Sequence, residues 1–213
     1  YAGTLALTAG SGFSFQQDGA LFLVTSRHVF RDEPGGHHPD RVEIVLHTDK
    51  QDLTRTQVIS LPLYEHGRAR WRQGTDSGGE VDVAALPIDP SNIPASATFT
   101  CFTPEHLVSN FGLVGTGSPV LLVGFPLGFY DTIHHLPVVR QAIVASAFGV
   151  RFQGLGYFLT DARMHRGASG APVVLRRPQG GPFPWTLIGV HSSRMDMRDR
   201  DKFEDEALGL NCA

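Results

Sequence analysis

The chain has 213 residues, of which 41% are hydrophobic and 18% are charged, which suits one substantial domain or two small fused units that share a core. Its 18 basic and 21 acidic residues give a formal net charge of −3, so the overall charge does not favour a nucleic-acid partner. No apolar run is long enough to predict a membrane span.

Short apolar or alternating runs dominate the chain and are bounded by glycine, proline, aspartate and asparagine. This pattern is typical of an all-β sandwich or barrel, and Asp18-Gly19 between the first two runs predicts a tight hairpin. The predicted strands lie within residues 12–15, 20–25, 41–47, 57–64, 81–88, 119–126, 138–148, 156–162, 171–177, 185–193 and 207–213.

The segments between these strands are mostly polar. Residues 31–40, 65–80 and 194–206 are predicted to be surface loops, and a Pro/Ser-rich stretch at residues 88–97 divides the strands into two groups. One helix is predicted at residues 103–110, where Thr103 can cap and Pro104 can take the first helical position.

The segment HRGASGAPVV, residues 165–174, places Ser169 between two glycines just before a predicted strand. A flexible turn that leads into the strand would explain the glycines. Alternatively, Ser169 is a nucleophile whose neighbouring backbone N–H groups point at a substrate oxygen. A serine hydroxyl is a weak nucleophile at neutral pH, so this second interpretation needs a histidine base and a group that orients the base.

Two residues elsewhere in the chain can supply those groups. His28 directly follows the apolar strand at residues 20–25, at the point where a loop is expected to begin. Asp82 opens another apolar strand, where a charge is costly unless it is paired or hydrogen-bonded; an exposed aspartate at a strand start is the alternative. The order His28, Asp82, Ser169, with each residue at the edge of a strand, predicts a catalytic triad.

Four blocks around these residues resemble the trypsin-like, chymotrypsin-fold serine proteases: residues 10–15, 21–29, 82–88 and 166–174. Residues 120–128 and 160–172 are similar to the strand and loop that precede the nucleophile in the bacterial disulfide-poor branch, near the HtrA/Deg and glutamyl-endopeptidase groups. The resemblance implies a single peptidase domain of two packed six-stranded antiparallel β-barrels, residues 1–97 and 98–213, with the active site in the cleft between them.

The resemblance implies a serine endopeptidase, regulatory or processing rather than digestive, that acts on a polypeptide substrate through an acyl-enzyme. His28 would be the base, Asp82 its orienting group and Ser169 the nucleophile. The backbone N–H groups of Gly167 and Ser169 would form the oxyanion hole. No cofactor or metal is expected, because the histidine pairs lack acidic or cysteine neighbours at zinc spacing. A non-catalytic peptide-binding module of the same fold is the alternative.

Three further positions follow from the resemblance. Arg163 stands where trypsins carry the aspartate that selects basic residues, and His191 aligns with the histidine by which glutamyl endopeptidases contact acidic side chains. Both favour Glu, Asp or Gln at the cleavage position; a small apolar pocket with Arg163 turned to solvent is the alternative. Ser192 falls where the family carries a serine that supports the catalytic aspartate beside the substrate backbone, although a strand-end hydroxyl also explains it.

Ala168 departs from the digestive proteases, which carry an aspartate there to pair with a new N-terminus, so activation is expected to differ and to order a loop through substrate or partner. The family's C-terminal helix, and any regulatory domain or activator, are expected outside these residues. Cys101 and Cys212 allow one disulfide, but we favour two buried thiols. Cysteine usage leaves both cytoplasm and periplasm open, and we favour the cytoplasm.

Overall fold

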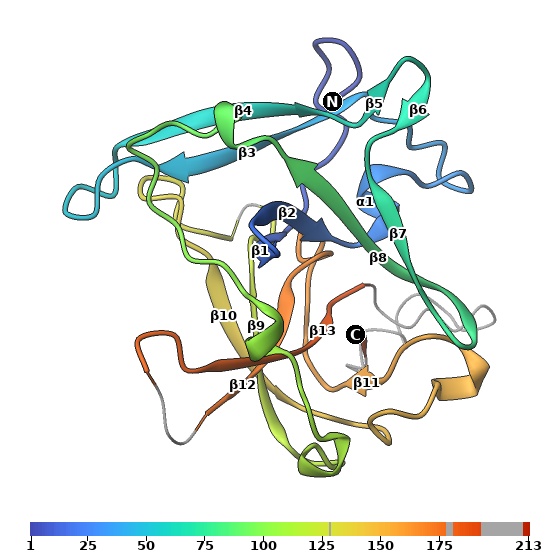
Figure 1. The fold of residues 1–213 in the computed structure, drawn as a ribbon. Helices are drawn as coiled ribbons and strands as arrows, with labels where there is room; N and C mark the ends of the chain where they lie inside the picture. The colour runs from blue at the N-terminus through green and yellow to red at the C-terminus, as the bar shows by residue number, and fades with distance from the viewer. Residues whose placement is uncertain (128, 178–180, 193–210) are drawn as a thin grey trace.

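Two halves, each built mainly of antiparallel strands, lie one above the other in the structure, a computed structural model (Figure 1). The structure describes residues 1–127, 129–177, 181–192 and 211–213. Strands are the main element of both halves, and a single α-helix, α1 (Arg27–Phe30), occurs in the described ranges. The predicted all-β class is therefore confirmed.

The first half contains one four-stranded sheet, with the strand order β1-β2-β8-β7, and two ribbons in which β3 pairs with β4 and β5 pairs with β6. Its strands are β1 (Phe13–Gln17), β2 (Ala20–Thr25), β3 (Arg41–His47), β4 (Thr56–Pro62), β5 (Tyr64–Glu65), β6 (Arg68–Ala69), β7 (Arg72–Asp76) and β8 (Gly79–Ile88). A 3₁₀ turn, η1 (Pro90–Asn92), follows the last of them.

The second half contains another four-stranded sheet, with the order β10-β9-β12-β13, and a ribbon of β11 with β14. Its strands are β9 (Pro119–Gly124), β10 (Val138–Ile143), β11 (Leu159–Thr160), β12 (Pro172–Arg176), β13 (Trp185–Val190) and β14 (Asn211–Cys212). Two 3₁₀ turns, η2 (Pro104–His106) and η3 (Phe111–Leu113), precede β9, and a third, η4 (Phe152–Gly154), lies between β10 and β11.

The hairpin that the sequence predicts at Asp18-Gly19 is present. Gln17 pairs with Ala20, and the two residues between them have positive φ angles of 50° and 80°. A two-residue loop with both φ angles positive is a type I′ turn, which matches the twist of the flanking strands. β1 and β2 therefore enter the sheet in a single register.

Two local predictions differ from the structure, and a third falls where the structure describes no residues. Residues 103–110 form only the 3₁₀ turn η2 at their start, because Leu107 takes an extended conformation with φ −73° and ψ 150°. Residues 65–80, predicted to be a loop, contain β6 and β7, because β6 pairs with β5 in a short ribbon and β7 pairs with β8 in the four-stranded sheet. The predicted loop at residues 194–206 lies outside the described residues.

Each half buries an apolar cluster of its own, and a third cluster joins them. The first half packs around Phe30, Leu63 and Leu86, and the second around Val120, Leu122 and Val173. The joining cluster takes residues from β1, β9, β12, β13 and the segment after residue 97: Phe13, Phe15, Phe102, Leu121, Val174, Phe183, Trp185 and Leu187. This buried contact holds the two halves against each other.

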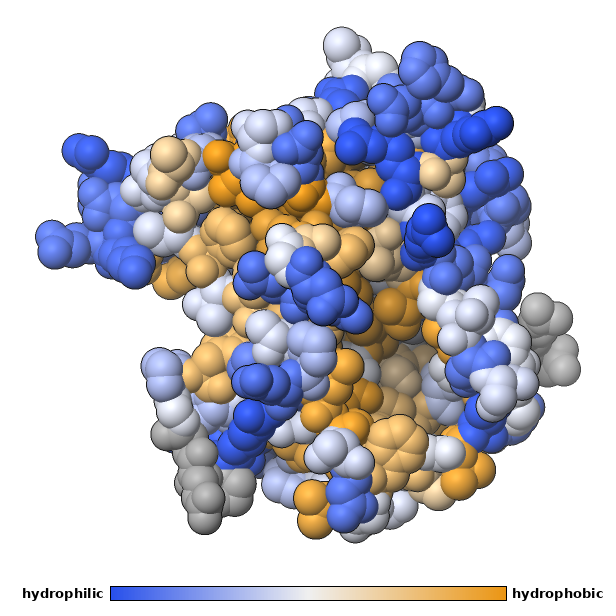
Figure 2. All heavy atoms as spheres, viewed as in Figure 1, coloured by the Kyte–Doolittle hydropathy of each residue, from blue (hydrophilic) through white to orange (hydrophobic). Residues whose placement is uncertain are grey.

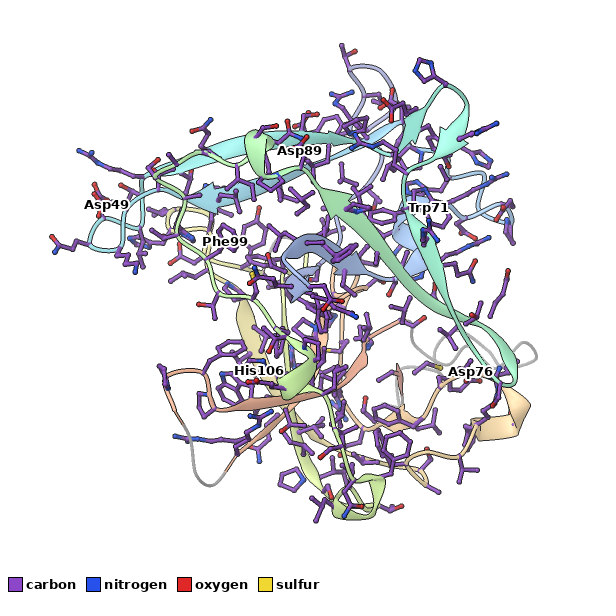
Figure 3. The ribbon with its side chains drawn as sticks, viewed as in Figure 1. Asp49, Trp71, Asp76, Asp89, Phe99 and His106 are labelled. Atoms are coloured by element: carbon purple, nitrogen blue, oxygen red, sulfur yellow. The ribbon has the colours of Figure 1, made fainter. Side chains whose placement is uncertain are left out.

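The surface of the first half differs from the region between the halves. Seen from one side, hydrophilic side chains cover the tip of the β3–β4 ribbon and the β5–β6 hairpin, while apolar side chains gather near the middle of the molecule (Figure 2). At the far tip of the β7–β8 hairpin, Asp76 forms an ion pair with Arg151 of the second half (Figure 3). Polar contacts therefore reinforce the apolar junction.

Candidate active site

His28 and Asp82 lie on neighbouring elements of the first half and contact each other directly. Thr25 at the end of β2 pairs with Ala84 of β8, which places the start of α1 beside Asp82. The His28 Nδ1 atom is 2.7 Å from Asp82 Oδ2, and the His28 backbone N–H donates to Asp82 Oδ1 at 3.0 Å. Asp82 is thus a paired carboxylate at the start of a buried strand segment, as its setting in the sequence required.

The helix that carries His28 is a single turn, where the sequence analysis expected a loop; that detail of the prediction is wrong. Phe30 at its end is fully buried, and the Phe30 and Trp71 ring centroids are 5.8 Å apart (Figure 3). A one-turn helix has little stability of its own, so these apolar contacts hold it in place. The backbone of His28 is therefore anchored to the core of the first half.

Asp82 is held in its ionised form. Burial raises the pKa of its carboxyl group, but hydrogen bonds from the His28 ring, the Ser192 hydroxyl and the His28 backbone N–H, together with the charge of His28, bring the pKa below its usual value. An ionised carboxylate can only accept hydrogen bonds, so the proton in the pair lies on His28 Nδ1. His28 Nε2 then carries the lone pair.

Ser169 lies in a loop between β11 and β12 that two glycines shape. Gly167 and Gly170 have φ angles of +89° and +90°, which side chains other than glycine rarely adopt. A Cβ atom on Gly167 would lie 2.7 Å from Leu127 N and Phe125 O, closer than atoms can pack. The glycines therefore let the backbone of this loop pack closely against the backbone of Phe125 and Leu127. The loop is held in one conformation by this packing and is not a flexible turn.

The hydroxyl group of Ser169 donates a hydrogen bond of 2.9 Å to the backbone carbonyl of Ser192. The contacts of the described residues include none between Ser169 Oγ and His28 Nε2. Ser192 also donates its own hydroxyl to Asp82 Oδ2. The four residues thus form one hydrogen-bonded chain, in which Ser192 lies between the nucleophile candidate and the carboxylate.

The N–H groups of Gly167 and Ser169 have no hydrogen-bond acceptor within the part of the chain that the structure describes. Arg166 O accepts a hydrogen bond of 2.8 Å from Leu127 N, and since the N–H and C=O of a trans peptide point in opposite directions, the Gly167 N–H points away from Leu127. Among the described residues, neither the Gly167 N–H nor the Ser169 N–H donates to a protein acceptor. Both are available to a ligand oxygen.

The two candidate specificity residues have different environments. Arg163 is exposed and forms no ion pair with the described residues. His191 is only 2% exposed, its Nδ1 atom has no hydrogen-bond partner among the described residues, and burial together with the charge of nearby His28 lowers its pKa to about 4. His191 is therefore a neutral, buried imidazole beside the site, whereas Arg163 faces solvent.

One residue at the site had no place in the sequence analysis. Ser11, 4% exposed, lies between the two halves and contacts the Ser169 loop through its side chain and its backbone. It belongs to one of the blocks that carried the family resemblance, but hydrogen bonds between residues 156 positions apart leave no local signal in the sequence.

Some other features bear on the expectations from sequence. The described residues contain no group of three or more His, Cys, Asp or Glu arranged to hold a metal ion. No disulfide joins Cys101 to Cys212. In the ranges that the structure covers, every helix is too short and too polar to cross a membrane.

The chain resembles known proteins in fold and in sequence pattern. The chain is similar to a solved structure described as the crystal structure of Deg5, with 16% sequence identity, a TM-score of 0.50, and coverage of 89% of this chain and 76% of that one. At this identity the likeness concerns the fold, and it agrees with the expected chymotrypsin-type architecture. No curated protein matches the sequence. A family model for the trypsin-like peptidase domain matches residues 10–180, so the chain belongs to the trypsin-like peptidase domain family.

Proposed function

We propose that this chain is a serine endopeptidase that cleaves a polypeptide through an acyl-enzyme, with Ser169 as nucleophile, His28 as base and Asp82 as the group that orients His28. One observation carries the proposal: residues from separate elements of both halves converge, since His28 is bonded to Asp82, and Ser192 binds Asp82 through its hydroxyl and Ser169 through its backbone carbonyl. Structural ion pairs are common, but a nucleophile, a base and an orienting carboxylate in one chain fit nucleophilic catalysis.

The first step of the reaction needs a small movement. The Ser169 hydroxyl must turn from the Ser192 carbonyl toward His28 Nε2, which begins with a change of the Ser169 side-chain rotamer. As Ser169 Oγ attacks the substrate carbonyl carbon, its proton passes to Nε2, and the carbonyl π electrons move onto oxygen. The N–H groups of Gly167 and Ser169 donate to that oxyanion, which supplies typically about 2.7–4 kcal/mol for each donor.

The second half of the reaction restores the enzyme. Protonated His28 gives its proton to the amine nitrogen as the C–N bond breaks, which leaves an ester on Ser169 and releases the first product. Water then loses a proton to His28 as it attacks the ester, and His28 returns that proton to Ser169 as the acid product leaves. Asp82 accepts from the Nδ1–H throughout and stabilises the transient imidazolium.

A preference for Glu, Asp or Gln before the cleaved bond is the specificity that we propose. The buried Nδ1 of His191, which lacks a partner within the ranges that the structure describes, supports this preference more than exposed Arg163 does. A neutral imidazole hydrogen-bonds an amide as well as a carboxylate, so Gln belongs in the set. A peptide library tests the idea: a preference for Val, Ala or Leu at this position would favour the small apolar pocket instead.

The experiment that tests the catalytic proposal compares the wild type with Ser169→Ala on an unfolded protein substrate and on a peptide library. We expect cleavage by the wild type, and labelling of Ser169 by a fluorophosphonate probe. Ser169→Ala should lose the labelling and roughly 10³-fold or more of the cleavage. Undiminished cleavage by Ser169→Ala would end the assignment.

A second candidate function, a peptide-binding module without turnover, is favoured by one observation. The Ser169 hydroxyl donates to Ser192 and makes no contact with His28 in the described structure. Such a module would bind peptides with the same affinity in the wild type and in Ser169→Ala, and neither protein would react with the fluorophosphonate probe.

A further inference from the structure

We infer that Ser11 is a positioning residue for the oxyanion hole: its side chain and backbone in the first half bind the carbonyl groups of Gly167 and Ser169, the two residues of the second half whose N–H groups would donate to the substrate oxygen. The inference deepens the proposed function and depends on it. Ser11 would not contact the reacting atoms; it would act through its hydrogen bonds to Gly167 and Ser169.

The side chain of Ser11 is fully used in this contact. Its hydroxyl donates to the Gly167 carbonyl at 2.8 Å and accepts from the Phe125 backbone N–H at 2.8 Å. The group is buried, with Ser11 only 4% exposed, so water does not substitute for either bond without an opening of the interface. Ser11 thus ties the nucleophile loop to the segment that follows β9.

The same segment holds the other side of Gly167. Leu127, two residues after Phe125, donates its N–H to Arg166 O at 2.8 Å. The Arg166–Gly167 peptide is thus fixed through its carbonyl, and the Gly167–Ala168 peptide is fixed through the carbonyl that Ser11 binds. Because peptide groups are planar, fixing both carbonyls sets the backbone angles of Gly167 and the direction of its N–H.

The backbone of Ser11 contacts the nucleophile itself. The Ser11 N–H donates to Ser169 O at 2.8 Å, and Thr25 Oγ1 donates to Ser11 O at 2.7 Å. A Cβ atom on Gly170 would overlap both Ser11 O and Thr25 Oγ1, so this contact is closely packed. Thr25 ends β2, two residues before the helical turn that contains His28, and the chain of contacts therefore relates the oxyanion loop to the base.

A serine is suited to this place for steric and chemical reasons. A Cβ atom on Gly124 would lie 2.9 Å from Ser11 Oγ, so little room surrounds the hydroxyl. Alanine at position 11 would keep the backbone bonds to Ser169 and Thr25 but would leave the Gly167 carbonyl and the Phe125 N–H buried without partners. Unpaired buried groups seek new partners, and the Gly167–Ala168 peptide can do so only by rotating.

The test compares Ser11→Ala with the wild type in peptide hydrolysis. We expect kcat to fall roughly 10- to 100-fold, less than the loss of a whole oxyanion donor, with KM unchanged within about twofold. A peptide aldehyde forms a tetrahedral adduct whose oxygen occupies the hole, so its affinity should fall by the same factor as kcat. Affinity of the uncleaved peptide, measured with and without Ser11→Ala in a Ser169→Ala background, should not change.

Ser118→Ala is the matched control. Ser118 Oγ accepts a backbone hydrogen bond of 3.0 Å from Gly115 before β9, at the opposite end of that strand from Phe125. The Ser118→Ala variant loses a serine hydroxyl and one hydrogen bond to a backbone N–H group, and both its kcat and its affinity for the aldehyde should stay at wild-type values. Should Ser11→Ala fail to fold, Ser11→Cys takes its place, because a thiol is only a weak hydrogen-bond donor and acceptor. We expect the same result for Ser11→Cys, a fall of kcat with KM unchanged.

Three outcomes separate this inference from the proposed function. Wild-type kcat and aldehyde affinity in Ser11→Ala, with the wild type active, would overturn the role of Ser11 alone. An equal loss of kcat, aldehyde affinity and peptide affinity would also overturn it, since that pattern indicates general damage to the fold. A wild type that neither cleaves peptides nor reacts with a fluorophosphonate would overturn the proposed function first.

Discussion

The two halves of the molecule contribute to the candidate site in different ways. The first half completes its part alone: His28 and Asp82 are both within it, and the β2–β8 ladder brings them together. The second half carries Ser169 on a loop that depends on the other half, through Ser11. We therefore expect the pair of His28 and Asp82 to assemble within the first half alone, whereas the loop of Ser169 should need the contact between the halves.

The two halves also differ in the hydrogen-bond partners of their site residues. In the first half His28 is bonded to Asp82, the partner that the proposed catalysis requires, but in the second half the Ser169 hydroxyl is bonded to Ser192 and not to His28 among the described contacts. Disturbing the first half should therefore remove the chemistry itself, and disturbing the second half should remove its alignment.

The largest effect is expected from Asp82→Asn in the first half. The amide has nearly the same shape as the carboxylate, but it stabilises neither the imidazolium nor the required tautomer, because its NH₂ group can turn toward Nδ1. We expect a fall of roughly 10⁴-fold in kcat. Steady-state assays of peptide cleavage measure this fall in kcat, and thermal unfolding checks that the variant is folded. A loss under tenfold would show that the pair of His28 and Asp82 is only structural.

Gly167→Ala should have the next largest effect, and it tests the second half alone. The φ angle of +89° is strained for alanine, and the added methyl group would lie 2.7 Å from Leu127 N, so the loop must shift. We expect kcat to fall roughly 10²- to 10³-fold, as when an oxyanion donor is lost.

The control for Gly167→Ala is the first half itself. The ¹H NMR signal of the His28 Nδ1–H, bonded to Asp82 at 2.7 Å, should persist in this variant. Its disappearance would contradict the view that the acid–base pair is assembled independently of the nucleophile loop.

His191 provides a pH-dependent test where the two halves meet. Its pKa is lowered to about 4 from 6.5, so as pH falls the unfolded chain takes up the proton first. The contribution of neutral His191 to stability is complete above about pH 6.5 and is lost as pH falls toward 4, which amounts to roughly 3 kcal/mol. Urea unfolding at pH 7 and pH 4.5 measures this loss.

His191→Gln is the variant to compare in those unfolding experiments. Since glutamine does not titrate, the free energy of unfolding of His191→Gln should depend less on pH across this range than that of the wild type. Equal slopes in the two proteins would mean that His191 is not buried in its neutral form.

The smallest effect is expected from Ser192→Ala, which removes the side-chain bond from the second half to Asp82. Asp82 keeps its two bonds from His28, so we expect kcat to fall only about tenfold, in line with the loss of one hydrogen bond to a charged group. Steady-state kinetics measure the change. A fall as large as that of Asp82→Asn would show that the first half does not hold its carboxylate alone.

The sequence was most informative where a local pattern has a direct physical cause. Asp18-Gly19 predicted its hairpin because two positive φ angles favour those residue types. Asp82 at the start of an apolar strand predicted a partner because an unpaired charge there is costly. Each of these inferences needs only a few neighbouring residues and a general energetic rule.

Other features escaped prediction because they depend on partners far along the chain. Polar residues 65–80 form strands only because β8 is there to pair with β7. The four-residue helix α1 exists only because Phe30 finds a buried place beside Trp71. Secondary-structure propensity and residue polarity predict neither the strands in residues 65–80 nor the helix α1, since tertiary contacts outweigh these local preferences in short segments.

The sequence by itself determined the all-β class, the family, and the three residue types that a serine nucleophile needs, because strand periodicity and chemical character are carried by each short segment. Only the tertiary structure decided that the Ser169 hydroxyl is bonded to Ser192, that His191 is buried and Arg163 exposed, and that Ser11 is hydrogen-bonded to Gly167 and Ser169. These are matters of direction and distance between groups on separate elements, and they exist only once the two halves have packed together.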